Sequence, residues 1–232
     1  MEAGGDGYVV KSDVSRELLA AVKAVGEGKR YISAKLVGLV FVGPPDLSER
    51  RTFHDLQICS NDASLVDGFA SFAAGGLNTG NAVLVLATKA RRQGMDQKLQ
   101  TQGFDLGAVA KSGGYISMDV SETLSWFMIE NRLDTERFVR LVDSVIERAG
   151  KAPNGVARRV LVCAECAPFL WARGKLEAAL RMEELWDAVA HKFGLNTLCG
   201  YVARKLHGRE ENRIMQAICA LHSRVIPCDA SL

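Results

Sequence analysis

A short, uncharged run of apolar residues constrains the fold more than any other part of the sequence. Residues 83–88 (VLVLAT) are rich in β-branched side chains, and about three turns of helix-compatible residues follow them. A continuous apolar run of this length is typical of a strand buried on both faces, as in a parallel sheet. The sequence therefore predicts a buried strand that leads directly into a helix.

The turn after this strand has the position of a phosphate-binding P-loop but lacks its residues. In a P-loop, glycines let backbone N–H groups surround a phosphate, and a lysine followed by Ser or Thr binds the outer phosphates and Mg²⁺. Residues 87–94 read ATKARRQG, with no Gly-Lys-Ser/Thr. We therefore predict a degenerate P-loop, no bound cofactor and no ATP hydrolysis.

Strand-like and helix-like segments alternate regularly from residue 54 to residue 202. The predicted strands cover residues 56–59, 82–88, 114–119, 159–165 and 197–202, and no strand is predicted beyond residue 202. The predicted helices begin after Asn61 or Asp62, at residue 90, at Ser121, after Asp134, at residue 176 and at residue 211. Such alternation favours βαβ units, and therefore a mostly parallel central sheet with helices on both faces.

The N-terminal stretch has a pattern of its own. A short strand is predicted at residues 8–11, followed by a helix at residues 12–27. This stretch resembles the last strand and last helix of a response-regulator receiver domain. Tyr8 then takes the switch-aromatic position, and Lys11 is the receiver-like lysine that pairs with the phosphoryl group.

The rest of a receiver domain, including its phosphoacceptor aspartate, has no counterpart in the sequence. A lysine alone cannot run phosphoryl transfer, so we interpret residues 1–42 as a strand-helix docking arm. Residues 43–51 (GPPDLSERR) contain two prolines and several charges, which indicates a linker. The main domain is then expected at residues 52–232.

Polar residues at the carboxyl ends of the predicted strands are the candidate ligand-binding residues. Because the carboxyl ends of parallel strands meet at one edge of a sheet, we expect these side chains to converge on one crevice. They are Thr88, Lys89, Arg91, Asp119, Glu165 and Tyr201. The two carboxylates could bind a metal, activate water or accept hydrogen bonds, and the two cationic side chains could meet an anionic ligand.

A structural role is an equally weighted alternative for four of these residues. Asp119 could cap the helix at Ser121, and Glu165 could form a buried ion pair with an arginine. Lys89 and Arg91 could simply be solvated on the first turn of their helix. The residue types alone leave both interpretations open.

The cysteines and histidines show no metal-ligand spacing. The six cysteines lie in apolar periodic segments, where reduced cysteine behaves as a small buried hydrophobe, and we expect a cytoplasmic protein. Cys163 and Cys166 form a CxxC pair, but no second pair completes a zinc site. The four histidines, His54, His191, His207 and His222, are interpreted as structural, and no metal site is predicted.

Charge and hydropathy exclude two further classes of partner. The 29 Lys and Arg residues and 27 Asp and Glu residues are interspersed, so the net charge of +2 gives no basis for nucleic-acid binding. No segment reaches the length of about 18 uninterrupted apolar residues that a membrane span requires. We expect no nucleic acid and no membrane as partners.

An ordered set of residues across positions 54–227 resembles the MEDS domain, the methanogen/methylotroph DcmR sensory domain. The set includes His54, the turn at residues 76–80, Asp119, Asp134, Glu165, Glu183, the segment at residues 198–201, Cys219 and His222. This resemblance implies a RecA/KaiC-like three-layer α/β sandwich found beside receiver and histidine-kinase domains in bacterial signalling proteins. The chain differs at two places, with Arg91 where a histidine is common and Ala164 where a glycine precedes the Walker-B-like Glu165.

Taken with that resemblance, the residues predict a non-catalytic sensory or signal-relay module of a bacterial two-component-type system. Its expected partner is a small-molecule ligand or a signalling protein such as a histidine kinase or regulator. We also expect a homodimer, because Leu18, Leu19, Val22 and Val25 form an uncovered apolar stripe on the N-terminal helix. The alternatives are a weak ATPase that uses Glu165 to activate water, and a structural docking protein with an empty crevice.

Overall fold

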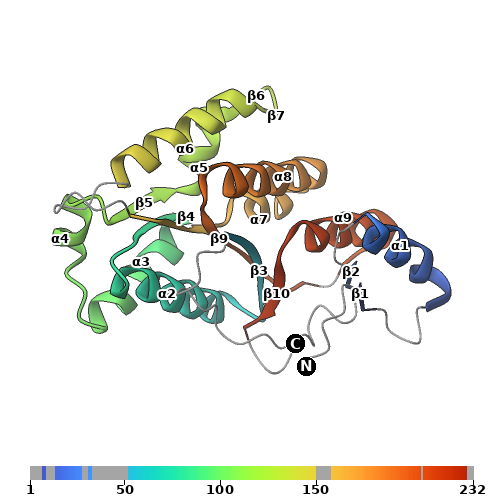
Figure 1. Cartoon of the computed structure of the whole chain (residues 1–232), viewed down its shortest axis with the longest axis horizontal. Coiled ribbons are helices and arrows are strands. Elements are labelled where there is room, and N and C mark those ends of the chain that lie inside the picture. The colour runs from blue at the N-terminus through green and yellow to red at the C-terminus, as the bar shows by residue number, and fades with distance from the viewer. Residues whose placement is uncertain are drawn as a thin grey trace.

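A computed structural model of the chain describes residues 7–8, 14–27, 31–32, 52–149, 158–204 and 206–228. Six strands form one sheet in the order β10-β3-β9-β8-β4-β5, and every pairing in it is parallel (Figure 1). Their bounds are β3 Phe53–Cys59, β4 Ala82–Ala87, β5 Tyr115–Asp119, β8 Val160–Ala164, β9 Asn196–Val202 and β10 Arg224–Pro227. The predicted parallel α/β sheet is confirmed, with β4 inside it between β8 and β5.

Helices cover both faces of this sheet (Figure 1). On one face lie α2 (Asp62–Asn78), α3 (Lys89–Thr101) and α4 (Leu106–Lys111). On the other lie α5 (Val120–Phe127), α6 (Thr135–Ala149), α7 (Cys166–Trp171), α8 (Leu176–Phe193) and α9 (Gly208–Leu221). The chain changes face after β5, because right-handed crossovers place helices on opposite faces when the direction of strand addition reverses.

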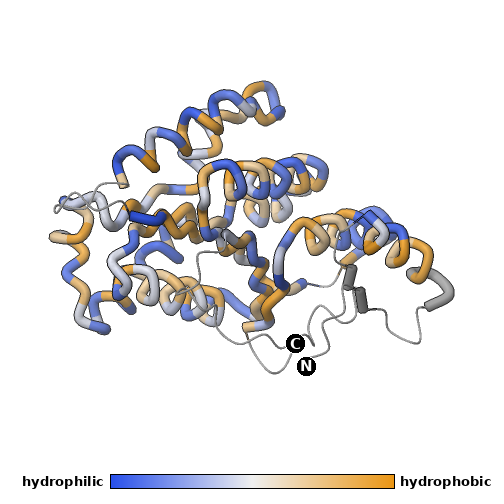
Figure 2. The backbone as a smooth tube through the Cα atoms, viewed as in Figure 1, coloured by the Kyte–Doolittle hydropathy of each residue, from blue (hydrophilic) through white to orange (hydrophobic). Residues whose placement is uncertain are grey.

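The core is divided by the sheet into two apolar layers. Along β4, Leu84 and Leu86 join the layer under α5 to α9, while Val83 and Val85 join the layer under α2 and α3. Because a layer packs on each face, β4 is buried at every position, as its uninterrupted apolar sequence predicts. Figure 2 shows the corresponding alternation of hydrophobic and hydrophilic residues around the helices.

Side-chain caps fix the first turns of several helices beside the sheet. Asn61 accepts a hydrogen bond from the backbone N–H of Ser64 and caps α2, one of the two caps expected from the sequence. Asp134 accepts one from the N–H of Arg137 at the start of α6. The antiparallel hairpin of β6 (Met128–Ile129) and β7 (Arg132–Leu133) precedes α6.

The strand β10 was not predicted, and its sequence explains why. It has only four residues and ends in Pro227, which lacks the N–H that an interior strand must donate. At the edge of the sheet this loss is tolerated, and Val225 pairs in register with Leu56 of β3. Parallel pairing across so long a sequence separation leaves no local pattern.

Two cysteines depart from the expectation that all six are reduced. Cys59 and Cys228 form a disulfide, with their Cα atoms 4.7 Å apart. The Cys228 N–H donates to the Ile58 carbonyl at 2.9 Å, which sets Cys228 beside the end of β3. The other four cysteines, Cys163, Cys166, Cys199 and Cys219, are free and buried as expected.

The N-terminal residues that the structure describes form a small strand-helix unit. β1 (Gly7–Tyr8) pairs in parallel with β2 (Tyr31–Ile32), and α1 (Val14–Gly26) connects them. This unit lies beside α9 (Figure 1). Lys11 and the predicted linker at 43–51 lie outside the described residues. Leu19 is 87% exposed on α1.

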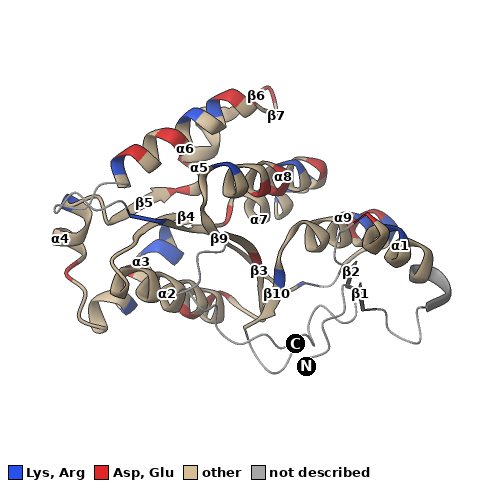
Figure 3. Ribbon diagram, in the orientation of Figure 1, with Lys and Arg blue, Asp and Glu red and all other residues tan. Residues whose placement is uncertain are grey.

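Charged residues are distributed without a dominant sign. Lys and Arg alternate with Asp and Glu along α6 (Figure 3). Among the helices that the structure describes, none is both long and apolar enough to cross a membrane.

Candidate functional site

Arg91 bridges three segments at the carboxyl edge of the sheet. It lies in the first turn of α3, just after β4. Its guanidinium donates to Glu165 Oε1 at 2.6 Å and to Asp62 Oδ1 at 2.8 Å. The other oxygen of Glu165 accepts the Thr88 backbone N–H at 3.0 Å. We call these four residues, Asp62, Thr88, Arg91 and Glu165, the arginine-bridged cluster.

The electrostatics of this cluster are largely satisfied within the protein. Glu165 is only 1% exposed, and burial raises the pKa of its carboxyl above the ordinary range. The positive charge of Arg91 and the Thr88 N–H oppose that rise by stabilising the carboxylate. The buried ion pair considered for Glu165 from the sequence is thus the arrangement that the structure shows.

The two turns that hold Asp62 and Arg91 lack the backbone of a phosphate cradle. Residues 60–62, after β3, and residues 88–91, after β4, contain no glycine. Asp62 also places a negative charge in the first turn of α2, where a phosphate would bind. These turns are therefore poorly suited to hold a nucleotide by its phosphates.

Asp119 lies at the end of β5 and does not join the arginine-bridged cluster. Its carboxylate accepts the backbone N–H groups of Ser121 at 2.9 Å and Glu122 at 3.3 Å, so it caps α5 as one of the two interpretations predicted. Its other oxygen pairs with Arg92 at 3.2 Å. Burial acts to raise the pKa of Asp119, but those N–H groups and Arg92 outweigh it and lower the pKa.

A pocket of about 510 Å³ lies along β5 beside this pair. Apolar and polar groups both line it, including Ile116, Met118, Trp126, Ser117, Arg92, Asp119 and Arg148. The Arg92 Nε atom is buried and has no hydrogen-bond partner among the described residues. The pocket thus combines an apolar wall with a donor that a ligand could satisfy.

The six predicted residues therefore do not meet in a single crevice. Thr88, Arg91 and Glu165 come together, Lys89 is exposed at the start of α3, and Asp119 borders the pocket. Tyr201 is buried elsewhere, where its hydroxyl donates to Glu183 Oε1 at 2.7 Å. The strands that carry these residues are consecutive in the sheet, but the side chains face different elements: Tyr201 joins the layer under α5 to α9, whereas Arg91 reaches Asp62 of α2. Ligand binding by these residues stays a prediction.

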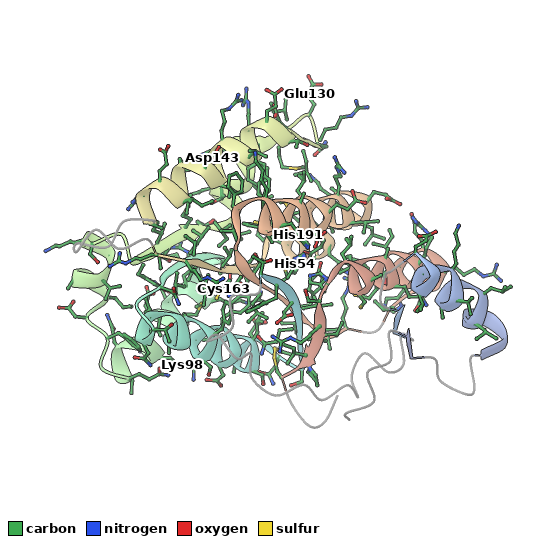
Figure 4. The ribbon with its side chains drawn as sticks, viewed as in Figure 1. His54, Lys98, Glu130, Asp143, Cys163 and His191 are labelled. Atoms are coloured by element: carbon green, nitrogen blue, oxygen red, sulfur yellow. A yellow bond between two sulfur atoms is a disulfide. The ribbon has the colours of Figure 1, made fainter. Side chains whose placement is uncertain are left out.

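Tyr201 leads to a second buried polar group, which the sequence analysis did not identify as a site. Four side chains, each 4% exposed or less, converge with one ligand atom apiece within 4.8 Å of one another. They are His54, Glu183, Cys199 and His222, which we call the histidine–cysteine cluster. His54 is labelled in the interior in Figure 4.

The contacts inside the histidine–cysteine cluster are short. His54 Nε2 lies 3.3 Å from Cys199 Sγ and 3.4 Å from Glu183 Oε2. His222 Nε2 lies 3.5 Å from the same oxygen, and the two imidazole rings are 4.0 Å apart at their centroids. Such a set of nitrogen, sulfur and oxygen donors is typical of transition-metal sites.

Burial and mutual interaction shift the ionisation of this cluster. Burial lowers the pKa of His222, and the nearby His54 charge lowers it further. Burial also acts to lower the pKa of His54, but the nearby carboxylates of Asp187 and Glu183 raise it overall. For Glu183, the two histidines outweigh burial and lower the pKa of the carboxyl.

No spacing rule could have found this cluster, because its members come from β3, α8, β9 and the residue after α9. The available signal was of another kind. Glu183 is a charged residue on the apolar side of a helix, among Ala179, Met182 and Trp186. Buried carboxylates are rarely left without partners.

The fold and these sites define a parallel α/β domain whose strand-end turns lack a P-loop. Within that class, residues 53–223 match the MEDS family, described as the methanogen/methylotroph DcmR sensory domain. Because this match spans more than half of the chain, the protein belongs to the MEDS family. No curated protein matches the chain.

Among solved structures, the chain is similar to a KaiC-like protein from the hyperthermophilic archaeon Pyrococcus horikoshii OT3. The two share 17% sequence identity with a TM-score of 0.46, over 75% of this chain and 76% of that one.

Proposed function

We propose that this MEDS-family protein is a non-catalytic sensory module that binds a small organic ligand in the pocket along β5. The observation that carries the proposal is a pocket of about 510 Å³ lined by Arg92, whose buried Nε has no hydrogen-bond partner among the described residues. A buried donor without a partner costs about 1–3 kcal/mol, so a ligand that accepts its hydrogen bond recovers that cost.

The lining of the pocket indicates the class of ligand. Arg92 and Arg148 contribute positive charge, Asp119 and Glu122 contribute negative charge, and Ile116, Met118 and Trp126 contribute apolar and aromatic surface. We therefore propose a small molecule with an apolar body and one acceptor group, such as a carboxylate.

The arginine-bridged cluster supports the absence of catalysis. A catalytic carboxylate must be free to polarise or deprotonate a water molecule. Both oxygens of Glu165 are already engaged, one by Arg91 and the other by the Thr88 N–H. Release of Glu165 would leave a buried charge without its partner, so the geometry favours a fixed structural ion pair.

Trp126 provides a direct test of ligand binding. This indole lines the pocket and is 54% exposed, whereas Trp171 and Trp186 are buried away from it. A library of small carboxylates and other apolar acceptors should therefore include ligands that change the fluorescence saturably, and Trp126→Phe should remove the response.

The Arg92→Met variant should weaken binding at least tenfold, since the ligand loses its charged donor. Arg140→Met, at an exposed position on α6, is the matched control and should bind as tightly as the wild type. Chemical turnover of the bound ligand would instead establish an enzyme. If neither the library nor a co-purifying molecule occupies the pocket, the protein acts through partner docking alone.

We further propose that the domain acts in the cytoplasm within a two-component-type system, with a histidine kinase or regulator as its partner. The resemblance of residues 8–27 to a receiver domain supports this context. A homodimer through α1 is part of the same proposal, because Leu18, Leu19 and Val22 are exposed there. Light scattering should show a dimer that Leu19→Glu dissociates and Lys23→Glu, on the same helix, does not.

A further inference from the structure

We infer that His54, Glu183, Cys199 and His222 form a binding site for one divalent transition-metal ion, with Zn²⁺ as the best match. The inference is independent of the sensory proposal, because the cluster is separate from the pocket along β5. It also revises the expectation from the sequence, in which His54 and His222 were structural and no metal site was predicted.

The spacing of the donor atoms fits tetrahedral coordination. With Zn–N and Zn–O distances of about 2.0–2.1 Å and Zn–S of about 2.3 Å, neighbouring ligand atoms of a tetrahedral site lie about 3.3–3.6 Å apart. Three of the six separations among the four donor atoms, 3.3, 3.4 and 3.5 Å, lie in this range and link His54, Cys199, Glu183 and His222 in one chain of contacts. The ligand atoms all fall within 4.8 Å, so one ion can reach each of them.

A hydrogen bond behind His222 turns a lone pair, not a proton, toward the centre. His222 Nδ1 lies 2.7 Å from the Ile218 carbonyl, which can only accept, so this nitrogen carries the proton and Nε2 presents its lone pair. His54 Nδ1 lies 3.6 Å from Asp187 Oδ1, close to a carboxylate but beyond hydrogen-bond distance. A carboxylate or carbonyl behind each imidazole is the usual support for a metal-ligating histidine.

Glu183 is held in the same manner. Tyr201 donates its hydroxyl to Oε1 at 2.7 Å, which leaves Oε2 facing the histidines. Glu183 Oε2 and His222 Nε2 are both buried and have no hydrogen-bond partner among the described residues. Acceptors brought together without a donor repel one another, and a cation at their centre removes that repulsion.

The donor set indicates the kind of ion. Two imidazoles, one thiolate and one carboxylate are ligands that Zn²⁺ accepts, and four protein ligands leave no open position for substrate. Binding displaces the Cys199 thiol proton to solvent as the sulfur–metal bond forms. A closed site of this type is structural or regulatory, and it would join β3, α8, β9 and the end of α9.

Zinc and cobalt titrations of the 232-residue chain test the inference directly. Metal is first removed with a chelator, without thiol reductant because Cys59 and Cys228 are bonded. Zn²⁺ should then bind with a stoichiometry of one, measured in competition with a chromogenic chelator. Co²⁺ should give the visible bands of a tetrahedral ion together with an ultraviolet thiolate-to-cobalt charge-transfer band.

Single substitutions assign the ligands. Cys199→Ser should abolish the charge-transfer band and weaken zinc binding at least tenfold, and His222→Gln should weaken it similarly. The matched controls are Cys163→Ser, whose sulfur faces the Phe69 carbonyl in the other apolar layer, and His207→Gln, at an exposed position just before α9. Both controls should bind as the wild type does, and circular dichroism verifies the fold of every variant.

The wild-type protein alone can overturn the inference, even if a ligand variant fails to fold. Folded wild type that binds no stoichiometric metal, or that binds Co²⁺ without the thiolate band, would show that the four residues form only a buried hydrogen-bonded network. Loss of the band in Cys163→Ser with its retention in Cys199→Ser would contradict the assignment equally.

Discussion

The two buried polar clusters of this domain differ in where their charge balance comes from. In the arginine-bridged cluster, Arg91 supplies a cation to Glu165 and Asp62, and a backbone N–H satisfies the remaining oxygen of Glu165. In the histidine–cysteine cluster, Glu183 Oε2 and His222 Nε2 have no hydrogen-bond partner in the part of the chain that the structure describes.

This difference gives a criterion that distinguishes a structural polar cluster from a candidate binding site. Both clusters are buried and both contain titratable groups with shifted pKa values, so neither burial nor a pKa shift distinguishes them. What distinguishes them is whether every donor and acceptor is matched inside the chain. In the first cluster no buried side-chain nitrogen or oxygen lacks a partner among the described residues, whereas in the second Glu183 Oε2 and His222 Nε2 do, and an additional cation would satisfy them.

Removal of metal should produce the largest change in the free energy of unfolding. If stability did not change, the two clusters would not differ in their need for a cation. With free Zn²⁺ about 1,000-fold above its dissociation constant, binding to the folded state alone adds about 4 kcal/mol to the free energy of unfolding. Urea denaturation with Zn²⁺ and after chelation should reveal this difference. Cys199→Ser should lose the gain and Cys163→Ser should keep it. An unchanged midpoint of urea denaturation in the wild type would show that the histidine–cysteine cluster needs no added cation.

Disruption of the arginine-bridged cluster should have the next largest effect. Arg91→Met leaves Glu165 buried without its cation and should lower the free energy of unfolding by about 3 kcal/mol at pH 7. The exposed Arg140–Glu136 pair is the matched comparison, and Arg140→Met should cost less than about 1 kcal/mol. Equal costs for the two substitutions would mean that the buried pair contributes no more than a surface pair.

The same variant makes a prediction about pH. Burial already raises the pKa of Glu165 in the folded state, and loss of the Arg91 charge raises it further. A carboxyl with a raised folded pKa retains a proton that the unfolded chain releases, so stability falls as pH rises above the ordinary glutamate range. The deficit of Arg91→Met should therefore be smaller at pH 5 than at pH 8. A constant deficit would show that Glu165 does not titrate in the variant.

The contrast also explains how much the sequence could predict. The sheet and most helices follow from local patterns, as in β4 with its continuous apolar run and α8 with its apolar side. The sequence could not identify the partner of Glu165. A buried carboxylate is expected to pair with a cation, but nothing in the local pattern shows that the cation is Arg91. The pairing of β10, the Cys59–Cys228 bond and the histidine–cysteine cluster join residues up to 169 positions apart, which no local periodicity records.

In its exposure, the Asp119–Arg92 pair lies between the buried Arg91–Glu165 pair and the exposed Arg140–Glu136 pair. Asp119→Ala removes the cap of α5 and should lower the free energy of unfolding by about 1 kcal/mol. Because its pKa is lowered in the folded state, this contribution is present above the ordinary aspartate pKa and is lost as pH falls. Urea denaturation at pH 7 and pH 3 tests both points, with Glu136→Ala as an exposed control. A larger cost at pH 3 would contradict the prediction.

The smallest effect is expected from Mg-ATP. Phosphate binding needs glycine-rich turns whose N–H groups converge, a lysine for the outer phosphates and a hydroxyl for Mg²⁺. The turn at residues 88–91 has no glycine, and Arg91 already pairs with the Glu165 carboxylate. Loss of those groups removes several kcal/mol of charge stabilisation from phosphoryl transfer, so turnover should be negligible.

Calorimetry and phosphate release at millimolar Mg-ATP measure this expectation, with Glu165→Gln as the matched variant. The wild type and the variant should both give background release and no saturable heat. Micromolar affinity with turnover that Glu165→Gln abolishes would show that Arg91 moves away from the carboxylate to admit a nucleotide. In that case the Arg91–Glu165 ion pair exists only in the nucleotide-free protein, and the cluster is an active site. The weak ATPase then replaces the sensory proposal.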